Sequence, residues 1–283
     1  MKKQKQKLTE KAFAVLTWGA AALTLGTLAF LIAFILIRGI PHLKPSLFAW
    51  EYTSENVSLL PAFVTTAEIT LLSLLIAVPL GVFSAIFLTE YAKRGNKAVA
   101  LVRLTAETLS GIPSIVYGLF GWLFFVTSLK WGFSLLSGAV TLSIMILPLI
   151  MRSAEEALKA VPDTYREGAF GLGAGKLRMV FRVALPAAMP GILAGVILAV
   201  GRIVGETAAL IYTAGTVAQI APSPMASART LSVHMYALSS EGLFMNESYA
   251  TAVVLLLLVA GINALSGFIA KRLGGKGERQ GGE

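Results

Sequence analysis

The residues best suited to chemistry are two charged side chains inside an apolar stretch. Arg202 and Glu206 are four positions apart, a spacing that puts both on one face of a helix. An arginine in hydrocarbon costs about 2.5–3.5 kcal/mol on insertion scales and usually serves a function. Its planar guanidinium can bind an oxyanion with two parallel hydrogen bonds. The pattern therefore predicts either an anion pathway that includes Arg202, Glu206 and Thr207, or a structural ion pair.

Two hydroxyl side chains flank a predicted helix break in the segment SGIPSIVYG. Gly111 and Pro113 interrupt an apolar run, and proline removes a backbone donor, so the helix must kink or break there. Ser110 and Ser114 lie on either side of the interruption. They either line a polar path or simply accompany a packing kink, and the sequence leaves both interpretations open.

Catalytic and metal-binding residues have little support in this chain. There is no cysteine, and the two histidines, His42 and His234, are too far apart to form a local metal motif. An intramembrane enzyme using Arg202, Glu206 and Glu107 would lack a nucleophile–base pair. We therefore predict no catalytic residue, no metal site and no cofactor on the chain, and we keep the enzyme as a rival hypothesis.

The elements that carry these residues follow from the composition. Of 283 residues, 56% are hydrophobic and only 14% are charged, whereas soluble domains carry about 25% charge. A helix of about 20 apolar residues crosses a bilayer. The charge-free run at 207–228 is polar and contains two prolines, so its start is assigned to the preceding helix. The prediction is an all-α polytopic membrane protein, a single domain over 1–283 with helices at about 13–37, 66–89, 105–127, 134–151, 188–214 and 249–270.

The distribution of basic residues gives an orientation. With six helices and both termini in the cytoplasm, 18 of the 24 lysines and arginines fall in cytoplasmic segments, as the positive-inside rule requires. The net charge of +9 is therefore a topology signal, and no nucleic-acid partner is predicted. The first apolar run of 26 residues is longer than the core of a cleaved signal peptide, so we interpret it as a retained helix.

The longest predicted cytoplasmic loop, at about 161–187, has helical signals. Thr164 and Glu167 have the spacing of a capping box, which predicts a short helix starting at Thr164. Glycines around Gly173 would then turn the chain. A second amphipathic piece is expected from Leu177, Val180, Phe181 and Ala184. The loop would project as a helix–turn–helix, and its GLGAG run lacks the positions of a nucleotide-binding loop.

This loop resembles the EAA motif of ABC-importer permease subunits, in the variant EGA. The matching residues are Glu167, Gly168, Ala169, Gly173, Val183, Leu185 and Pro186. The resemblance implies a type I ABC importer permease, whose motif forms a coupling helix that docks into the ATPase subunit. These residues, together with Thr164, would transmit ATP-driven motion to the membrane helices. Alternatively, Glu167 only caps its own helix.

Three further stretches resemble the phosphate-specific permeases, and the last favours the A-type subunit. They are SGIPSIVYGLFG at 110–121, GRIVGETAALIYTAG at 201–215 and LSVHMY at 231–236. The resemblance covers about residues 60–270 and implies import of inorganic phosphate by alternating access across a bacterial cytoplasmic membrane. Implied partners are a C-type permease subunit, a dimeric ATPase that binds ATP and magnesium, and an extracytoplasmic phosphate-binding protein. Another oxyanion, such as sulfate or molybdate, is the alternative substrate.

Overall fold

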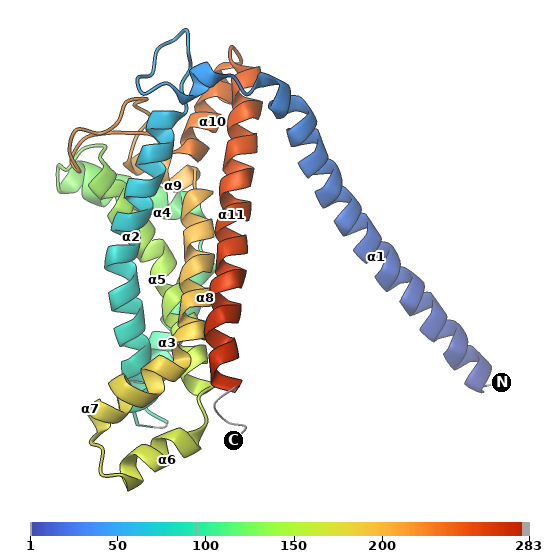
Figure 1. Ribbon diagram of the computed structural model, residues 1–283, viewed down its shortest axis with the longest axis vertical. Helices are drawn as coiled ribbons and strands as arrows, with labels where there is room; N and C mark the ends of the chain where they lie inside the picture. The colour runs from blue at the N-terminus through green and yellow to red at the C-terminus, as the bar shows by residue number, and fades with distance from the viewer. Residues whose placement is uncertain (1, 94, 279–283) are drawn as a thin grey trace.

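The computed structural model describes residues 2–93 and 95–278, which form helices and connecting loops without strands. The helices form an elongated bundle with α6 and α7 at one end and α10 at the other (Figure 1). The α-helices are α1 (Lys2–Gly39), α2 (Leu60–Ile86), α3 (Lys97–Ser110), α4 (Ser114–Gly121), α5 (Leu135–Lys159), α6 (Asp163–Gly171), α7 (Lys176–Met179), α8 (Leu185–Val204), α9 (Ala208–Thr213), α10 (Leu231–Glu241) and α11 (Met245–Glu278). Two 3₁₀ turns, η1 (Ile40–His42) and η2 (Pro45–Phe48), follow α1, and π-helical segments η3 (Phe87–Tyr91), η4 (Trp122–Ser128) and η5 (Val180–Ala184) extend or join the longer helices.

The membrane-spanning capacity agrees with the predicted fold class. Five helical stretches are long and apolar enough to cross a bilayer, and the pair α3 and α4 makes a sixth if it counts as one span. That pair bends by 99° at 111–113, so the predicted continuous helix over 105–127 is two helices. The reason is Pro113, which cannot donate to the preceding turn and becomes the extended residue before α4.

The predicted helix over 188–214 also differs from the structure at both ends. The helix begins earlier, because α7, η5 and α8 form one continuous stretch from Lys176 to Val204. It ends earlier because residues 205–207 leave helical geometry and α9 starts anew at Ala208. The carboxylate of Glu206 accepts a hydrogen bond from the Ala209 backbone nitrogen at 3.1 Å, which satisfies a donor at the start of α9.

Helix α5 lies at the centre of the bundle and packs against α2 and α8. Its buried face includes Leu142, Met145 and Ile146. Close approach to α8 depends on small residues, because a Cβ added at Gly191 would lie 2.7 Å from the Cβ of Ala157. The core therefore holds α5 and α8 at a fixed separation, with the Arg202 end of α8 facing away from α6.

Helix α1 diverges from the bundle along most of its length (Figure 1). Its apolar window from Phe13 onward has no buried residues, and it packs on α11 near its C-terminal end, where Phe34 and Tyr249 make an edge-to-face contact at 5.9 Å. A helix that is apolar on all sides and leaves these residues exposed is suited to contact with lipid or another membrane helix.

Candidate functional site

The first part of the site is the break between α8 and α9. Arg202 is half-buried in the last turn of α8, and Glu206 lies in the break with only 9% of its surface exposed. No ion pair joins them, and the guanidinium of Arg202 has no hydrogen bond or ion pair to any residue that the structure describes. The predicted Arg202–Glu206 pair is therefore wrong, because Glu206 instead binds the backbone of α9.

Helix α4 brings the α3–α4 bend beside the α8–α9 break. A Cβ added at Gly118 would lie 2.8 Å from the Cα of Ala209, so α4 and α9 are in backbone contact. Tyr117 is buried next to this contact, and its hydroxyl donates to the carbonyl of Leu109 across the α3–α4 bend at 2.7 Å. The α3–α4 bend, predicted from Pro113, thus lies close to the α8–α9 break, which the sequence did not predict.

The three hydroxyl side chains predicted for the pathway have different surroundings. Ser110 donates to the carbonyl of Ala106 at 2.9 Å and lines a 220 Å³ cavity among charged residues of α3 and α5. Ser114 is half-buried at the start of α4. Thr207 lies in the α8–α9 break, where its hydroxyl is 3.4 Å from the carbonyl of Gly205. Ser114 and Thr207 thus belong to the two meeting breaks, while Ser110 points toward α5.

The second part of the site is the predicted helix–turn–helix, which is present as α6, a turn and α7 (Figure 1). The predicted capping box is wrong: α6 begins at Asp163 after Pro162, and no side chain caps it. Thr164 and Glu167 are exposed instead. The turn closes with hydrogen bonds from Gly173 to Phe170 and from Ala174 to Ala169, both at 2.9 Å, and Gly173 takes a left-handed φ of 80°.

The remaining residues of the motif divide between packing and exposure. Ala169 is buried against the helix that follows the turn, and Leu185 is half-buried. Gly168 and Pro186 are exposed. In the second amphipathic piece, Val180 and Ala184 are buried as predicted. Leu177 and Phe181 are exposed, and Met179 is buried instead. Apolar side chains therefore remain at the surface of the projecting loop, with Leu172 at its tip 92% exposed.

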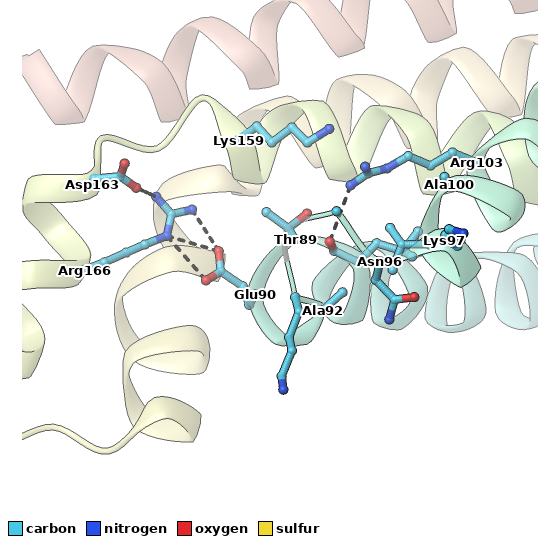
Figure 2. Close-up of a pocket in the computed structure, with 14 residues that line it drawn as sticks. Thr89, Glu90, Ala92, Asn96, Lys97, Ala100, Arg103, Lys159, Asp163 and Arg166 are labelled. Carbon is cyan, nitrogen blue, oxygen red and sulfur yellow. Dashed lines mark hydrogen bonds and ion pairs between the residues drawn. The ribbon is translucent and has the colours of Figure 1, made fainter.

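A buried ion pair ties α6 to the membrane helices. Arg166 contacts Glu90 in η3 at 2.8 Å, and the two side chains are 15% and 5% exposed. The same guanidinium contacts Asp163 at 3.1 Å (Figure 2). It also donates to the carbonyls of Leu158 and Val161, both at 2.8 Å or less. These charged hydrogen bonds raise the pKa of Arg166 above its ordinary value, with Glu90 as the main cause. The loop is thereby fixed to the end of α2.

This anchor borders a cavity of 620 Å³ that opens beside η3 and α3 (Figure 2). Lys93, Lys97, Arg103 and Lys159 line it with the anchor residues. Arg103 and Lys159 both contact Glu155, at 2.6 and 2.7 Å. Within the described ranges, no three histidine, aspartate or glutamate residues are grouped as a metal would need.

Family comparison agrees with this architecture. Residues 77–276 match the model of the family described as "Binding-protein-dependent transport system inner membrane component". The chain belongs to this family of transporter permeases. The match includes the α6–α7 loop, the bend between α3 and α4, and the α8–α9 break, so the family predicted from the EAA-like motif is confirmed.

Named relatives of this permease include phosphate transport proteins. The "Probable ABC transporter permease protein YqgI" of Bacillus subtilis is 33% identical over 84% of the chain and 86% of its own length. The "Phosphate transport system permease protein PstA 2" of Mycobacterium bovis is 36% identical over 64% of the chain and 60% of its own length. The A-type phosphate permeases are thus relatives of this chain at moderate identity.

Solved structures of other importers share the fold of this permease. A bacterial alginate ABC transporter chain superposes with a TM-score of 0.62 at 17% identity, covering 90% of this chain and 95% of that chain. A chain of the MetNI methionine ABC transporter gives 0.57 at 20% identity, covering 85% and 96%. These chains serve different substrates, so the shared fold does not select the substrate.

Several residues at the site were not predicted from the sequence. Glu90 and Arg166 are far apart in the chain, and only the fold brings them together. At the α10 end, Arg229 and His234 are buried at 7% and 1% exposure beside Tyr52. The sequence gives no sign of the burial of Arg229, because only the fold places it beside Tyr52.

Proposed function

We propose that this permease is the A-type subunit of a phosphate importer. The observation that carries the proposal is Arg202, a half-buried guanidinium without a protein partner in the described structure, at the junction of two broken helices. Broken helices expose backbone groups that a polar substrate can use, and an arginine fork matches phosphate oxygens. The PstA relatives support phosphate as that substrate.

In the proposed mechanism, phosphate passes the α8–α9 break and contacts Arg202, and Ser114 and Thr207 contribute hydroxyl groups nearby. Ser110, at the edge of the α3–α4 bend, is proposed to contribute a further hydroxyl to the path. The carboxylate of Glu206, fixed to α9, keeps a negative charge close to the path. A weak site is required, because an anion bound too tightly would not be released. Alternating access of the surrounding helices would then move phosphate inward.

The proposed drive comes from partner subunits. A dimeric ATPase, which would bind ATP and magnesium, engages the α6–α7 loop through the exposed apolar side chains around Leu172. Thr164, Glu167, Gly168, Ala169, Gly173, Leu185 and Pro186 are the proposed coupling residues. A homologous C-type permease subunit completes the pore, and an extracytoplasmic phosphate-binding protein delivers substrate at the α10 end. Both chain termini and the α6 end would be cytoplasmic, and this chain itself would hold no cofactor.

Two substitutions at Arg202 test the proposal. In the assembled complex, Arg202→Gln is expected to abolish ATP-dependent uptake of radiolabelled phosphate, whereas Arg202→Lys retains part of it because a point charge remains. Subunit assembly and ATP hydrolysis are measured in parallel. Full uptake by the Gln variant in a normally assembled complex would refute a transport role for Arg202.

The two alternatives have separate tests. If sulfate or molybdate competes with phosphate uptake at equal concentration, the permease serves another oxyanion. Turnover of a substrate by the isolated chain without an ATPase would favour the intramembrane enzyme based on Arg202, Glu206 and Glu107. The break geometry argues against the enzyme, because Glu206 is engaged by the α9 backbone rather than paired with a nucleophile.

A further inference from the structure

A second arginine is buried at the α10 end without a polar partner. Arg229 is 7% exposed, and its Nε and Nη2 atoms are buried and make no hydrogen bond within the described structure. Its guanidinium carbon instead lies 4.8 Å from the centre of the Tyr52 ring. A buried guanidinium normally has a carboxylate or several hydrogen-bond acceptors, and an aromatic face replaces only part of the lost hydration. The arrangement is suited to an anionic ligand.

His234 completes the set of polar groups around the same ring. It is 1% exposed, neither ring nitrogen has a hydrogen-bond partner, and its ring meets the edge of Tyr52 at 6.1 Å. Burial, and secondarily the charge of Arg229, lower the pKa of His234 to about 3. The imidazole is therefore neutral at physiological pH and has one N–H donor and one nitrogen acceptor.

Tyr52 separates these groups from an open cavity. The cavity has a volume of 430 Å³ and is lined by Trp50, Glu51, Tyr52, Pro61, Gln219 and Ile220. The loop that carries Tyr52 is held by the Asn56 side chain, which accepts hydrogen bonds from the backbone nitrogens of Thr53 and Ser58 at 2.9 and 3.0 Å. Rotation of the half-buried Tyr52 ring would therefore connect the cavity to Arg229 without unfolding the loop.

The Arg229 segment is also connected to the α8–α9 break. Its backbone nitrogen donates to the carbonyl of Val217 at 2.9 Å, which fixes the segment before α10. Three residues on, the Ser232 hydroxyl donates to the backbone carbonyl of Glu206 at 2.5 Å. A ligand that changes the position of this segment would therefore act directly on the backbone of the proposed substrate path.

We propose that Arg229 and His234 form an oxyanion site at the outer end of the permease, covered by Tyr52 and selective for a protonated oxyanion such as phosphate. The guanidinium donates to the oxygens. The neutral histidine accepts a hydrogen bond from a phosphate O–H, which sulfate does not have at neutral pH. The choice of phosphate rests on the proposed function; the existence of an oxyanion site rests on the burial and missing partners of Arg229 and His234.

Arginine-directed labelling of the purified complex tests this site. Phenylglyoxal modification of each arginine is followed by peptide mass spectrometry, with and without inorganic phosphate or sulfate at equal ionic strength. Loss of the aromatic cover in Tyr52→Ala is expected to speed modification of Arg229 about tenfold, the equivalent of one moderate cation–π contact. Phosphate should slow that modification, and sulfate should not.

Two matched controls accompany the measurement. Tyr52→Phe keeps the ring over Arg229, so phenylglyoxal is expected to modify Arg229 in this variant at the wild-type rate. Arg38, which also lies over an aromatic ring, at 5.9 Å from that of Phe34, but is exposed, should not respond to phosphate in any variant. If Tyr52→Ala fails to assemble, the modification of Arg229 is followed in the wild-type complex instead. It is slower there, but its rates with phosphate and with sulfate can be compared in the same way.

The outcomes separate this inference from the proposed function. A complex that imports phosphate but whose Arg229 is never protected would overturn the outer site alone. Equal protection by sulfate and phosphate would overturn the role given to His234 and with it the selective site. Protection of Arg229 by phosphate in a complex that imports none would support the outer site while refuting the proposed function.

Discussion

Single residues decide how the projecting loop is attached to the membrane helices. Glu90 and Arg166 form the most buried of the ion pairs found in the described part of the chain. Because Arg166 also binds the carbonyls of Leu158 and Val161, it joins η3, the end of α5 and α6 at one point. This guanidinium therefore links α6 to the end of α2 by direct contacts.

Removal of the buried carboxylate should destabilise the protein strongly. Glu90→Gln leaves Arg166 partly buried and without its main counter-charge, which costs about 3 kcal/mol when one partner of a buried pair is lost. The matched control is Glu156→Gln, which removes the Arg152–Glu156 pair and should leave the thermal midpoint almost unchanged, because both side chains are exposed to solvent. Thermal unfolding of the two purified variants measures the difference, and equal midpoints would contradict a structural role for Glu90.

For single residues, the amino-acid type was a better guide than the expected position of one side chain relative to another. The cost of arginine in hydrocarbon singled out Arg202 as a candidate, and its role stays a prediction; the expected pairing with Glu206 assumed a continuous helix. Nothing in the letters GET requires a break, because all three residues occur in helices. The break depends on tertiary contacts, including the Glu206 bond to Ala209 and the bond from Ser232 to the Glu206 carbonyl.

Among the elements, the turn between α6 and α7 depends on backbone conformation rather than on side-chain contacts. Gly173 has a φ of 80°, a conformation that L-residues adopt with strain. A Cβ at this position would meet no atom within 4 Å, so space is not the constraint. The glycine predicted from the EAA-like motif is therefore needed for the direction of the chain.

Two glycine substitutions in this loop should have opposite effects. Gly173→Ala is expected to cost about 1–2 kcal/mol and to lower ATP-driven phosphate uptake, because the left-handed turn positions α6 against its proposed ATPase partner. Gly168→Ala lies in the interior of α6 with open space around it and should stabilise that helix by up to about 1 kcal/mol. Uptake and thermal midpoints are measured together; loss of uptake in both variants would show that loop contacts, rather than turn geometry, matter.

The positions of the apolar helices and of the Pro113 bend were predictable from the sequence alone. Charge-free runs located the apolar helices because hydrocarbon excludes charge, and Pro113 located the bend because proline lacks a donor. The capping box was wrong because a side chain that could cap a helix need not do so when Pro162 already fixes the preceding backbone. Propensity rules identify such candidates, and local geometry selects among them.

For the whole molecule, the long-range pairings were beyond the sequence. Charge counting predicted two chemically different ends, but it did not predict that Tyr52 would lie over Arg229 or that η3 would contact α6. Each pairing joins segments separated by several helices, and a single sequence contains no measure of such distances. The same limit applies to α1, because its charge-free run predicted a helix but not its divergence from the bundle (Figure 1).

The orientation of the molecule has a direct test, because the chain contains no cysteine. A single cysteine can be introduced at Leu172, at the tip of the α6–α7 loop, or at Leu243, after α10 at the opposite end; both side chains are highly exposed, at 92% and 79%. With the positive-inside orientation, a membrane-impermeant maleimide should label Leu243→Cys in intact cells. It should label Leu172→Cys only after the membrane is permeabilised. The reverse pattern would place the proposed coupling loop outside, away from any ATP-driven partner, and would refute the proposed mechanism together with the outer location of the Arg229 site.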